Sequence, residues 1–457
     1  MRLLTILCLS IFALTNQTIH AQSNISSELS GNAEMLIEKA MSSDIAWDRF
    51  NYMVDTFGPR FSGTQNLEDA IDWILKEMDN DDLENIWGQP VMVPHWVRGK
   101  ESATLITPRK KNLPMLGLGG SVATPEQGIQ AEVLIVRSFD ELFDRADEAK
   151  GKIVLYNVPF TTYGETVQYR VNGASEAAKH GAVASLVRSV GPYSMKTPHT
   201  GTSRYQDGVP KIPHAAITVE DAMMLQRMND RGDKIEILLK MEAETFPDVQ
   251  SRNVIAEIKG SEFPDEIIVL GGHIDSWDVG QGAMDDGGGC IAAWEAVRLM
   301  KELGIRPKRT VRVVLWTNEE NGLRGANEYY RMVKEDENSL DNHVLAMESD
   351  AGVFDPIGFG FSGSDEAYEI LVEIGKYLED IESGVVAKGG GGADIGPLMN
   401  DGVPGMGLNV DGSKYFWYHH THADTIDKLN KEDFNECVAT MAVFAYMVAD
   451  LEERLPR

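Results

Sequence analysis

Residues 266–289 constrain the fold more than any other part of this 457-residue chain. They read E-I-I-V-L-G-G-H-I-D-S-W-D-V-G-Q-G-A-M-D-D-G-G-G. The uninterrupted apolar run at 267–270 is typical of a strand that is buried on both faces of a sheet. The polar side chains that follow it closely are His273, Asp275, Asp285 and Asp286. Because open α/β sheets bind their ligands at the carboxyl ends of their strands, this stretch predicts a functional site.

Three later segments repeat this pattern of an apolar strand followed by acids or histidines. The strands are expected at 310–317, 344–347 and 405–409. The side chains that follow them are Glu319, Glu320, Glu348, Asp350, His419 and His420. Any one of these would usually be a helix cap, part of a turn or a solvated surface group. Four such strand ends in one α/β sheet instead predict a metal site where the strands end together.

Alternating strands and helices continue from residue 253 to the end of the chain, which predicts an α/β fold with a mixed, mostly parallel sheet covered by helices. The sequence pattern changes at about residue 113, where a compact, β-rich module begins. This module contains few clusters of catalytic residue types. We therefore expect residues 22–112 and 249–457 to form one discontinuous domain. Residues 113–248 are expected to be an insert within it.

The first residues, M-R-L-L-T-I-L-C-L-S-I-F-A-L-T, combine a basic start with a short apolar core. They predict a secretory signal peptide at residues 1–21, with cleavage after Ala21. An uncleaved anchor is the alternative, although the apolar core is too short to span a bilayer. No other stretch resembles a transmembrane helix, so the protein is expected to be secreted or periplasmic.

The composition limits the partners and the metal ligands. A formal net charge of −29 repels phosphate backbones and argues against nucleic acid as a partner. The simplest interpretation of this charge is an acidic, soluble surface. Outside the predicted signal peptide the chain has only Cys290 and Cys437, each in an apolar helical pattern that indicates a buried thiol. Any metal must therefore be held by His, Asp and Glu.

The residue types favour zinc or a similar divalent ion, since imidazole combined with carboxylates suits Zn²⁺, whereas an all-oxygen set would suit Mg²⁺ or Ca²⁺. One tetrahedral catalytic zinc ion needs only three protein ligands, and this cluster contains more carboxylates than that. Two ions that share a bridging carboxylate would account for the surplus.

The motifs H-x-D, M-D-D-G, N-E-E, E-S-D and H-T-H-A-D-T occur here in that order. In this respect the chain resembles the co-catalytic di-zinc aminopeptidases and glutamate carboxypeptidases, and the resemblance covers essentially the whole chain after the predicted signal peptide. It implies a zinc exopeptidase fold and two Zn²⁺ ions. It also implies that the insert at 113–248 is a protease-associated domain.

The resemblance assigns roles to the motif residues. The implied metal ligands are His273 and Asp350 for one ion, Glu320 and His420 for the other, and Asp285 as the bridge. Glu319 matches the general base, which takes a proton from the water between the ions and passes it to the leaving amine. Asp275 matches the carboxylate that orients His273. A cis peptide bond is expected between Asp285 and Asp286.

Two positions stay open. The related glutamate carboxypeptidases have a tyrosine before the histidine ligand that helps to hold the oxyanion, and here that position is His419, which could serve if it presents an N–H group. Asp394, after four glycines, is either a helix N-cap or a group that binds the free amine of the substrate.

The resemblance implies an exopeptidase that hydrolyses dipeptides or short peptides with free termini. An aminopeptidase that trims longer peptides is the close alternative. An inactive, receptor-like binding protein is the alternative from another class, although such relatives lose metal ligands that are all present here. Because the family tends towards dimers, a homodimer is also expected.

Overall fold

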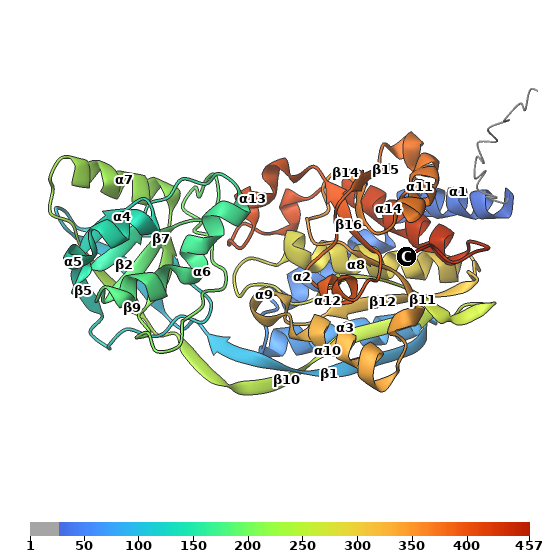
Figure 1. The fold of residues 1–457 in the computed structure, drawn as a ribbon, viewed down its shortest axis with the longest axis horizontal. Helices are drawn as coiled ribbons and strands as arrows, with labels where there is room; N and C mark the ends of the chain where they lie inside the picture. Colours follow the sequence, from blue (N-terminus) through green and yellow to red (C-terminus); the bar gives the residue numbers. More distant parts are fainter. Residues whose placement is uncertain (1–26) are drawn as a thin grey trace, which may run out of the picture.

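The computed structural model describes residues 27–457, so the predicted signal peptide at 1–21 lies outside the described residues. The protein has two lobes, each built on an eight-stranded sheet (Figure 1). The larger lobe carries the amino-terminal helices and the carboxyl-terminal half of the chain, and the smaller lobe is formed by the middle of the chain.

The sheet of the larger lobe has the strand order β1-β10-β12-β11-β13-β16-β14-β15. Its central strands β12, β11, β13 and β16 run parallel to one another. The pairs β1–β10, β10–β12 and β14–β16 are antiparallel, and β15 is parallel to β14. The strands are β1 (Glu84–Val97), β10 (Glu244–Ile258), β11 (Phe263–His273), β12 (Arg309–Trp316), β13 (His343–Glu348), β14 (Pro356–Ser362), β15 (Val385–Lys388) and β16 (Gly405–Val410). The predicted mixed α/β fold is confirmed.

Helices cover both faces of this sheet because its central strands are apolar on both sides. Leu270 and Val313 belong to the core under α8 and α14, whereas Val269 and Val314 belong to the core under α10 and α12. The helices of this lobe are α1 (Ser27–Ser42), α2 (Ile45–Phe57), α3 (Gln65–Asn80), α8 (Gly288–Glu302), α9 (Glu319–Gly322), α10 (Arg324–Arg331), α11 (Asp365–Gly375), α12 (Gly396–Asn400), α13 (Tyr415–Tyr418) and α14 (Lys431–Ala449).

The sheet of the smaller lobe has the order β3-β2-β9-β5-β6-β7-β8-β4. Strands β5 to β8 are parallel, and the lobe is itself of α/β type, with four helices. The elements are β2 (Glu101–Thr107), β3 (Lys111–Leu113), β4 (Met115–Gly117), β5 (Ile129–Val136), α4 (Phe139–Asp144), α5 (Ala146–Ala149), β6 (Ile153–Tyr156), α6 (Tyr163–Lys179), β7 (Ala184–Arg188), β8 (His214–Ile217), α7 (Val219–Asp230) and β9 (Glu236–Met241).

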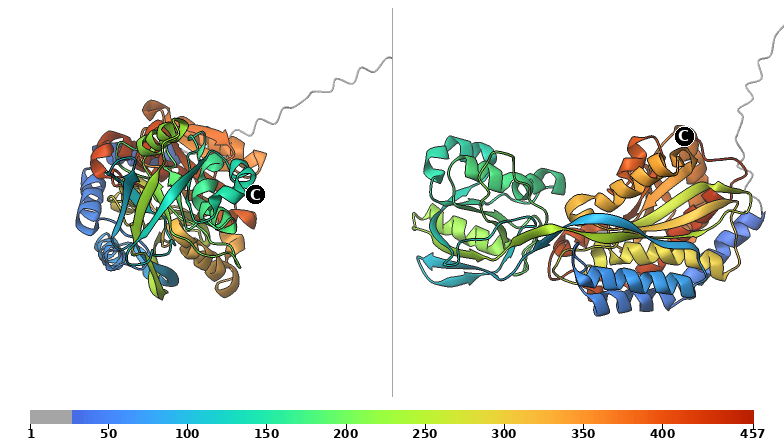
Figure 2. Two further views of the ribbon diagram at one scale, coloured as in Figure 1. Left: turned by 90° about the vertical axis from the view of Figure 1, so that its left-hand side faces the viewer. Right: turned by 90° about the horizontal axis from the view of Figure 1, so that it is seen from below.

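The boundaries 113–248 stay a prediction, and the topology bears on where the insert starts. Strand β2 precedes residue 113 and already pairs with β9 in the second sheet. The two lobes are joined by a ribbon of β1 and β10, which pair from Glu84↔Glu257 to Val97↔Glu244 (Figure 2). The chain therefore leaves the first sheet along β1 and returns to it along β10.

Two smaller expectations are tested by the same structure. Cys290 and Cys437 are free and buried, as predicted. Among residues 27–457, none of the helices is both long and apolar enough to cross a membrane.

Candidate metal centre

The candidate site lies where three neighbouring parallel strands end. Strand β11 ends at His273 itself, and β12 ends shortly before Glu319 and Glu320, which begin α9. Strand β13 ends at Glu348, two residues before Asp350. Because these strands pair in the order β12-β11-β13, the three ends share one edge of the sheet, which is where α/β folds place their ligands.

Asp285 lies at the centre of the cluster, and its two carboxylate oxygens face in different directions. Oδ1 lies 3.2 Å from Nε2 of His273, which in turn lies 3.3 Å from Oδ1 of Asp350. Oδ2 lies 3.3 Å from Nε2 of His420, which lies 3.0 Å from Oε2 of Glu320. The structure therefore brings the five expected ligands together as two groups on either side of one carboxylate.

The electrostatics of the cluster show an excess of buried carboxylates. Burial disfavours charge on His273 and Asp285, but the hydrogen bonds between them raise the pKa of His273 well above its ordinary value and lower that of Asp285 well below. Burial, with Asp285 close by, raises the pKa of Glu320 to about 7, against the opposing effect of His420. The acids thus depend on protons and charged histidines for compensation, which is the role a bound divalent cation would take over.

Unused acceptors also fit a cation. Oδ2 of Asp285 and Oε1 of Glu320 are buried and receive no hydrogen bond. Ligand atoms of His273, Asp285 and Glu320 lie within 4.8 Å of one another, as do those of Asp285, His419 and His420. A third such group consists of His273, Asp286 and Asp350. Buried polar atoms without partners are rare, so these acceptors match the donor set that a divalent cation requires.

The loop that carries Asp285 is held by Asp424, which lies far away in the chain. Asp424 accepts hydrogen bonds from the backbone N–H groups of Ala283 and Met284 at 3.0 and 2.7 Å, and from that of Asp285 at 3.3 Å. The expected cis peptide bond between Asp285 and Asp286 is present. Asp286 itself accepts from the N–H of His273, so its carboxylate fixes backbone geometry.

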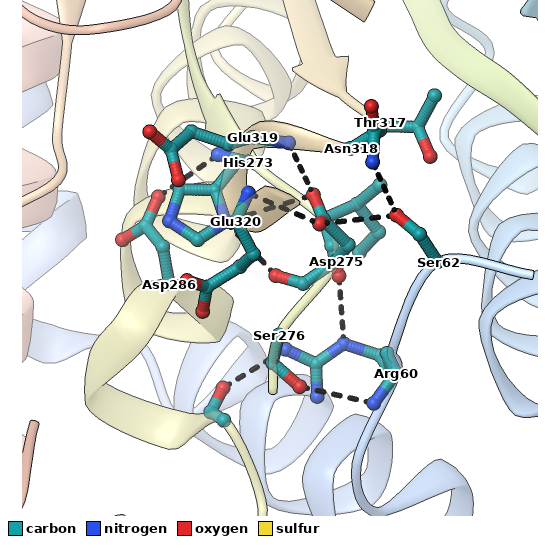
Figure 3. A network of polar contacts seen from close by, with 12 residues as sticks. Arg60, Ser62, His273, Asp275, Ser276, Asp286, Thr317, Asn318, Glu319 and Glu320 are labelled. Atoms are coloured by element: carbon teal, nitrogen blue, oxygen red, sulfur yellow. Dashed lines mark hydrogen bonds and ion pairs between the residues drawn. The ribbon is translucent and has the colours of Figure 1, made fainter. Parts of the chain in front are cut away.

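Arg60, which the sequence did not single out, lies near the amino terminus of the chain and holds the backbone just before Asp285. Its fully buried guanidinium donates to the carbonyl oxygens of Ile274, Gln281 and Gly282, each at 2.9 Å (Figure 3 shows its environment). Because Arg60 and residue 274 are more than 200 positions apart, no local sequence pattern predicts this contact.

Asp275 makes different contacts from those expected. Nδ1 of His273 bonds to the backbone oxygen of Asp275 at 2.9 Å, whereas the carboxylate oxygen Oδ1 lies 3.8 Å away. The carboxylate instead accepts from the N–H of Glu319 at 2.9 Å and from the hydroxyl of Ser62 at 3.3 Å (Figure 3). The buried Asp275 side chain therefore holds the loop that begins α9, and its backbone orients the histidine.

Glu319 and His419 line a cavity of about 560 Å³ beside the cluster. Burial, followed by the charges of Asp350 and Glu320, raises the pKa of Glu319 well above its ordinary value. The ring of His419 stacks on that of His420 with centroids 3.6 Å apart, and its Nδ1 has no hydrogen-bond partner. Both side chains thus stand where a substrate would meet the cluster.

Asp394 is not the N-cap of α12, because neither of its carboxylate oxygens accepts a hydrogen bond. The side chain is buried at 1% exposure, next to the buried Glu348. Asp394 is not among the residues that line the cavity, and its contact with a substrate amine stays a prediction.

Comparison with known proteins decides the family. Residues 253–445 match the family model described as "Peptidase family M28". Carboxypeptidase Q of Xenopus laevis is 51% identical over 451 residues, which cover 97% of this chain and 96% of that protein. The chain belongs to peptidase family M28. Human carboxypeptidase Q is 52% identical over 412 residues, covering 90% of this chain and 87% of that protein.

Solved structures of family M28 peptidases have the same fold. The peptidase M28 precursor from Shewanella amazonensis is 36% identical, with a TM-score of 0.89 over 94% of this chain and 98% of that one. An aminopeptidase from Aneurinibacillus, at 20% identity and a TM-score of 0.65, is similar in fold. The predicted resemblance is therefore confirmed, and the protein is a metallo-exopeptidase of family M28.

Proposed function

We propose that this peptidase holds two zinc ions that share Asp285. The observation that carries the proposal is the split of the Asp285 carboxylate, with one oxygen facing His273 and the other facing His420. The proposed ligands are His273 and Asp350 on one side, Glu320 and His420 on the other, and Asp285 between them. One carboxylate between two ions also explains why a cluster so rich in acids is stable when buried.

Glu319 is the proposed general base. Zinc ions, when bound, would polarise the peptide carbonyl and lower the pKa of the attacking water. The carboxylate of Glu319 faces the cavity while its backbone N–H is fixed by Asp275, so the side chain can take a proton from water on the cavity side. The same group then delivers that proton to the leaving amine. His419 is proposed to donate an N–H to the oxyanion.

The proposed substrates are dipeptides or short peptides with free termini. The cavity is of a size typical for small ligands, and one side of it is the acidic cluster, which suits an ammonium group. Another part of its wall contains Arg170 and Arg204 from the smaller lobe, and among the described residues neither forms an ion pair with a carboxylate. A free carboxylate of a substrate would supply the missing partner.

A substrate panel separates the alternatives. The zinc-loaded protein is expected to cleave Ala-Ala and Ser-Met faster than an N-blocked dipeptide, a dipeptide amide or an amino-acid anilide. Faster cleavage of the anilide and of longer peptides would favour the aminopeptidase alternative. Metal analysis is expected to give about two zinc ions per chain, and a chain that binds no zinc would favour the inactive binding protein.

We further propose that the protein acts outside the cytoplasm after removal of residues 1–21, that residues 113–248 are a protease-associated insert, and that the chain forms a homodimer. Size measurement of the purified protein by light scattering tests the last point. Sequencing of the mature amino terminus tests the first.

A further inference from the structure

A short segment of the smaller lobe contacts two of the proposed metal ligands. This segment, residues 200–202, is called the strap. The hydroxyl Oγ1 of Thr202 donates to the backbone oxygen of Glu320 at 2.8 Å. The backbone N–H of Thr200 donates to the backbone oxygen of His420 at 2.9 Å, and Nδ1 of His420 lies 3.3 Å from the backbone oxygen of Thr200.

The strap is fixed within the smaller lobe on its other side. The hydroxyl of Thr200 donates to the backbone oxygen of Gly117 at 2.9 Å, and the N–H of Gly119 donates to the oxygen of Gly201 at 3.0 Å. Arg170, which is 5% exposed, donates from Nη1 to the oxygen of Thr200 at 3.3 Å. The position of the strap therefore follows the position of the smaller lobe.

Among residues 27–457, the strap bonds to ligands in one half of the metal centre. Glu320 and His420 are the ligands proposed for the Oδ2 side of Asp285. On the Oδ1 side, Nδ1 of His273 bonds to the backbone oxygen of Asp275. The backbone N–H of His273 donates to the carboxylate of Asp286, and these residues all belong to the larger lobe. One half of the site is thus built by a single lobe, and the other half is completed by two.

We propose that the strap positions Glu320 and His420, so that the smaller lobe sets the affinity of one of the two ions. Nδ1 of His420 lies 3.3 Å from the backbone oxygen of Thr200 and 3.4 Å from Nη1 of Arg170, so groups of the smaller lobe hold this side of the ring while Nε2 faces the metal centre. The bond from Thr202 fixes the loop that presents Glu320. Partners of this kind change metal affinity by about 10–100-fold when they are removed.

This inference rests on the proposed two-ion site, and zinc titration of the full chain tests it. Zinc is added to the metal-free protein in competition with a chromophoric chelator, so that both dissociation constants are measured. Thr202→Val removes the hydroxyl and keeps the branched shape. We expect it to weaken one site by about ten-fold or more and to leave the other unchanged. Thr202→Ser, which restores a hydroxyl, is expected to recover most of the affinity.

Thr104→Val is the matched control, because Thr104 lies in β2 and its hydroxyl donates to Oδ1 of Asn112 in the same sheet. It should leave both affinities unchanged. Thermal unfolding of the metal-free proteins checks that each variant folds. If Thr202→Val does not fold, Thr200→Val, which removes the bond to Gly117, gives the second measurement, with an effect in the same direction.

The outcomes separate the inference from the function on which it rests. Two bound ions in the unaltered protein, with neither affinity changed in the strap variant, would overturn the inference alone. An equal loss at both sites would also overturn it, because the strap contacts only one half. If the unaltered protein binds one ion or none, the two-ion proposal fails and the inference fails with it.

Discussion

Each lobe contains four neighbouring parallel strands, yet only one set ends in a candidate metal site. In the larger lobe, a histidine and carboxylates lie at or just after the ends of β11, β12 and β13. In the smaller lobe the residues that directly follow β5, β6, β7 and β8 are Arg137, Asn157, Ser189 and Thr218. Both sheets offer the same kind of edge, so the chemistry depends on the few side chains placed there and not on the parallel topology.

Replacing the shared carboxylate should have the largest effect. Asp285→Asn removes the charge between the two proposed ions, so zinc content is expected to fall from about two per chain to near zero, with loss of detectable dipeptide hydrolysis. Zinc at 100 times its dissociation constant should stabilise the unaltered protein by about 2.7 kcal/mol for each ion bound, and this increase should vanish in the variant. Thermal unfolding with and without zinc measures it.

The control for Asp285→Asn is Asp140→Asn in α4, which follows β5 in the smaller lobe. It should change neither zinc content nor the stabilisation by zinc. If Asp285→Asn keeps two tightly bound ions, Asp285 does not bridge them and the contrast between the two sheet edges loses its basis.

Replacing the proposed base should abolish turnover but leave the metal in place. Glu319→Gln keeps the shape of the side chain and its backbone bond to Asp275 but cannot accept a proton. We expect kcat for Ala-Ala to fall by about 10²–10⁴-fold with two zinc ions still bound. Steady-state kinetics together with metal analysis measures both. Glu126→Gln, an exposed position in the smaller lobe, is the matched control. Retained turnover in the Glu319 variant would show that another group accepts the proton.

Replacing Arg204 on the cavity wall should have a smaller effect that depends on the substrate. Arg204 is exposed and is contributed by the smaller lobe. Arg204→Gln is expected to raise KM for Ala-Ala by about ten-fold, equivalent to about 1.4 kcal/mol, while KM for the corresponding dipeptide amide changes little. An equal rise in KM for both substrates would mean that Arg204 does not bind the substrate carboxylate.

The smallest effect is expected at the corresponding edge of the second sheet. Thr218 follows β8 and caps α7, where its side chain accepts from the N–H of Asp221 at 3.0 Å. Thr218→Ala should lower the free energy of unfolding by about 1 kcal/mol without changing kcat or zinc content. Denaturant unfolding and kinetics check it. A loss of zinc in this variant would contradict the view that this edge is purely structural.

Much of the site could be predicted from the sequence because its residues follow apolar strands directly. His273, Glu320 and Asp350 each lie within a few residues of a strand that the apolar runs made recognisable. The parallel order of the central strands then accounts for their meeting at one edge. Resemblance to the family was needed to separate His420 from its neighbours, since nothing local distinguishes adjacent histidines.

The remaining contacts depend on distances in the chain that no local pattern spans. The guanidinium of Arg60 holds loops more than 200 residues away, and Thr202 contacts Glu320 across 118 positions. Which atom of Asp275 orients His273 is likewise a matter of side-chain packing. Such contacts depend on how the lobes and loops pack against one another. Hydrophobic periodicity predicts helices and strands, but it does not predict this packing.

The β1–β10 ribbon has a consequence for how the two lobes are held together. Val97 and Glu244 face each other in register, so the smaller lobe begins and ends at adjacent points of one hairpin-like ribbon. The whole smaller lobe is thus enclosed between two paired residues and interrupts neither strand of the ribbon. The smaller lobe is therefore tied to the larger one both at this ribbon and at the strap.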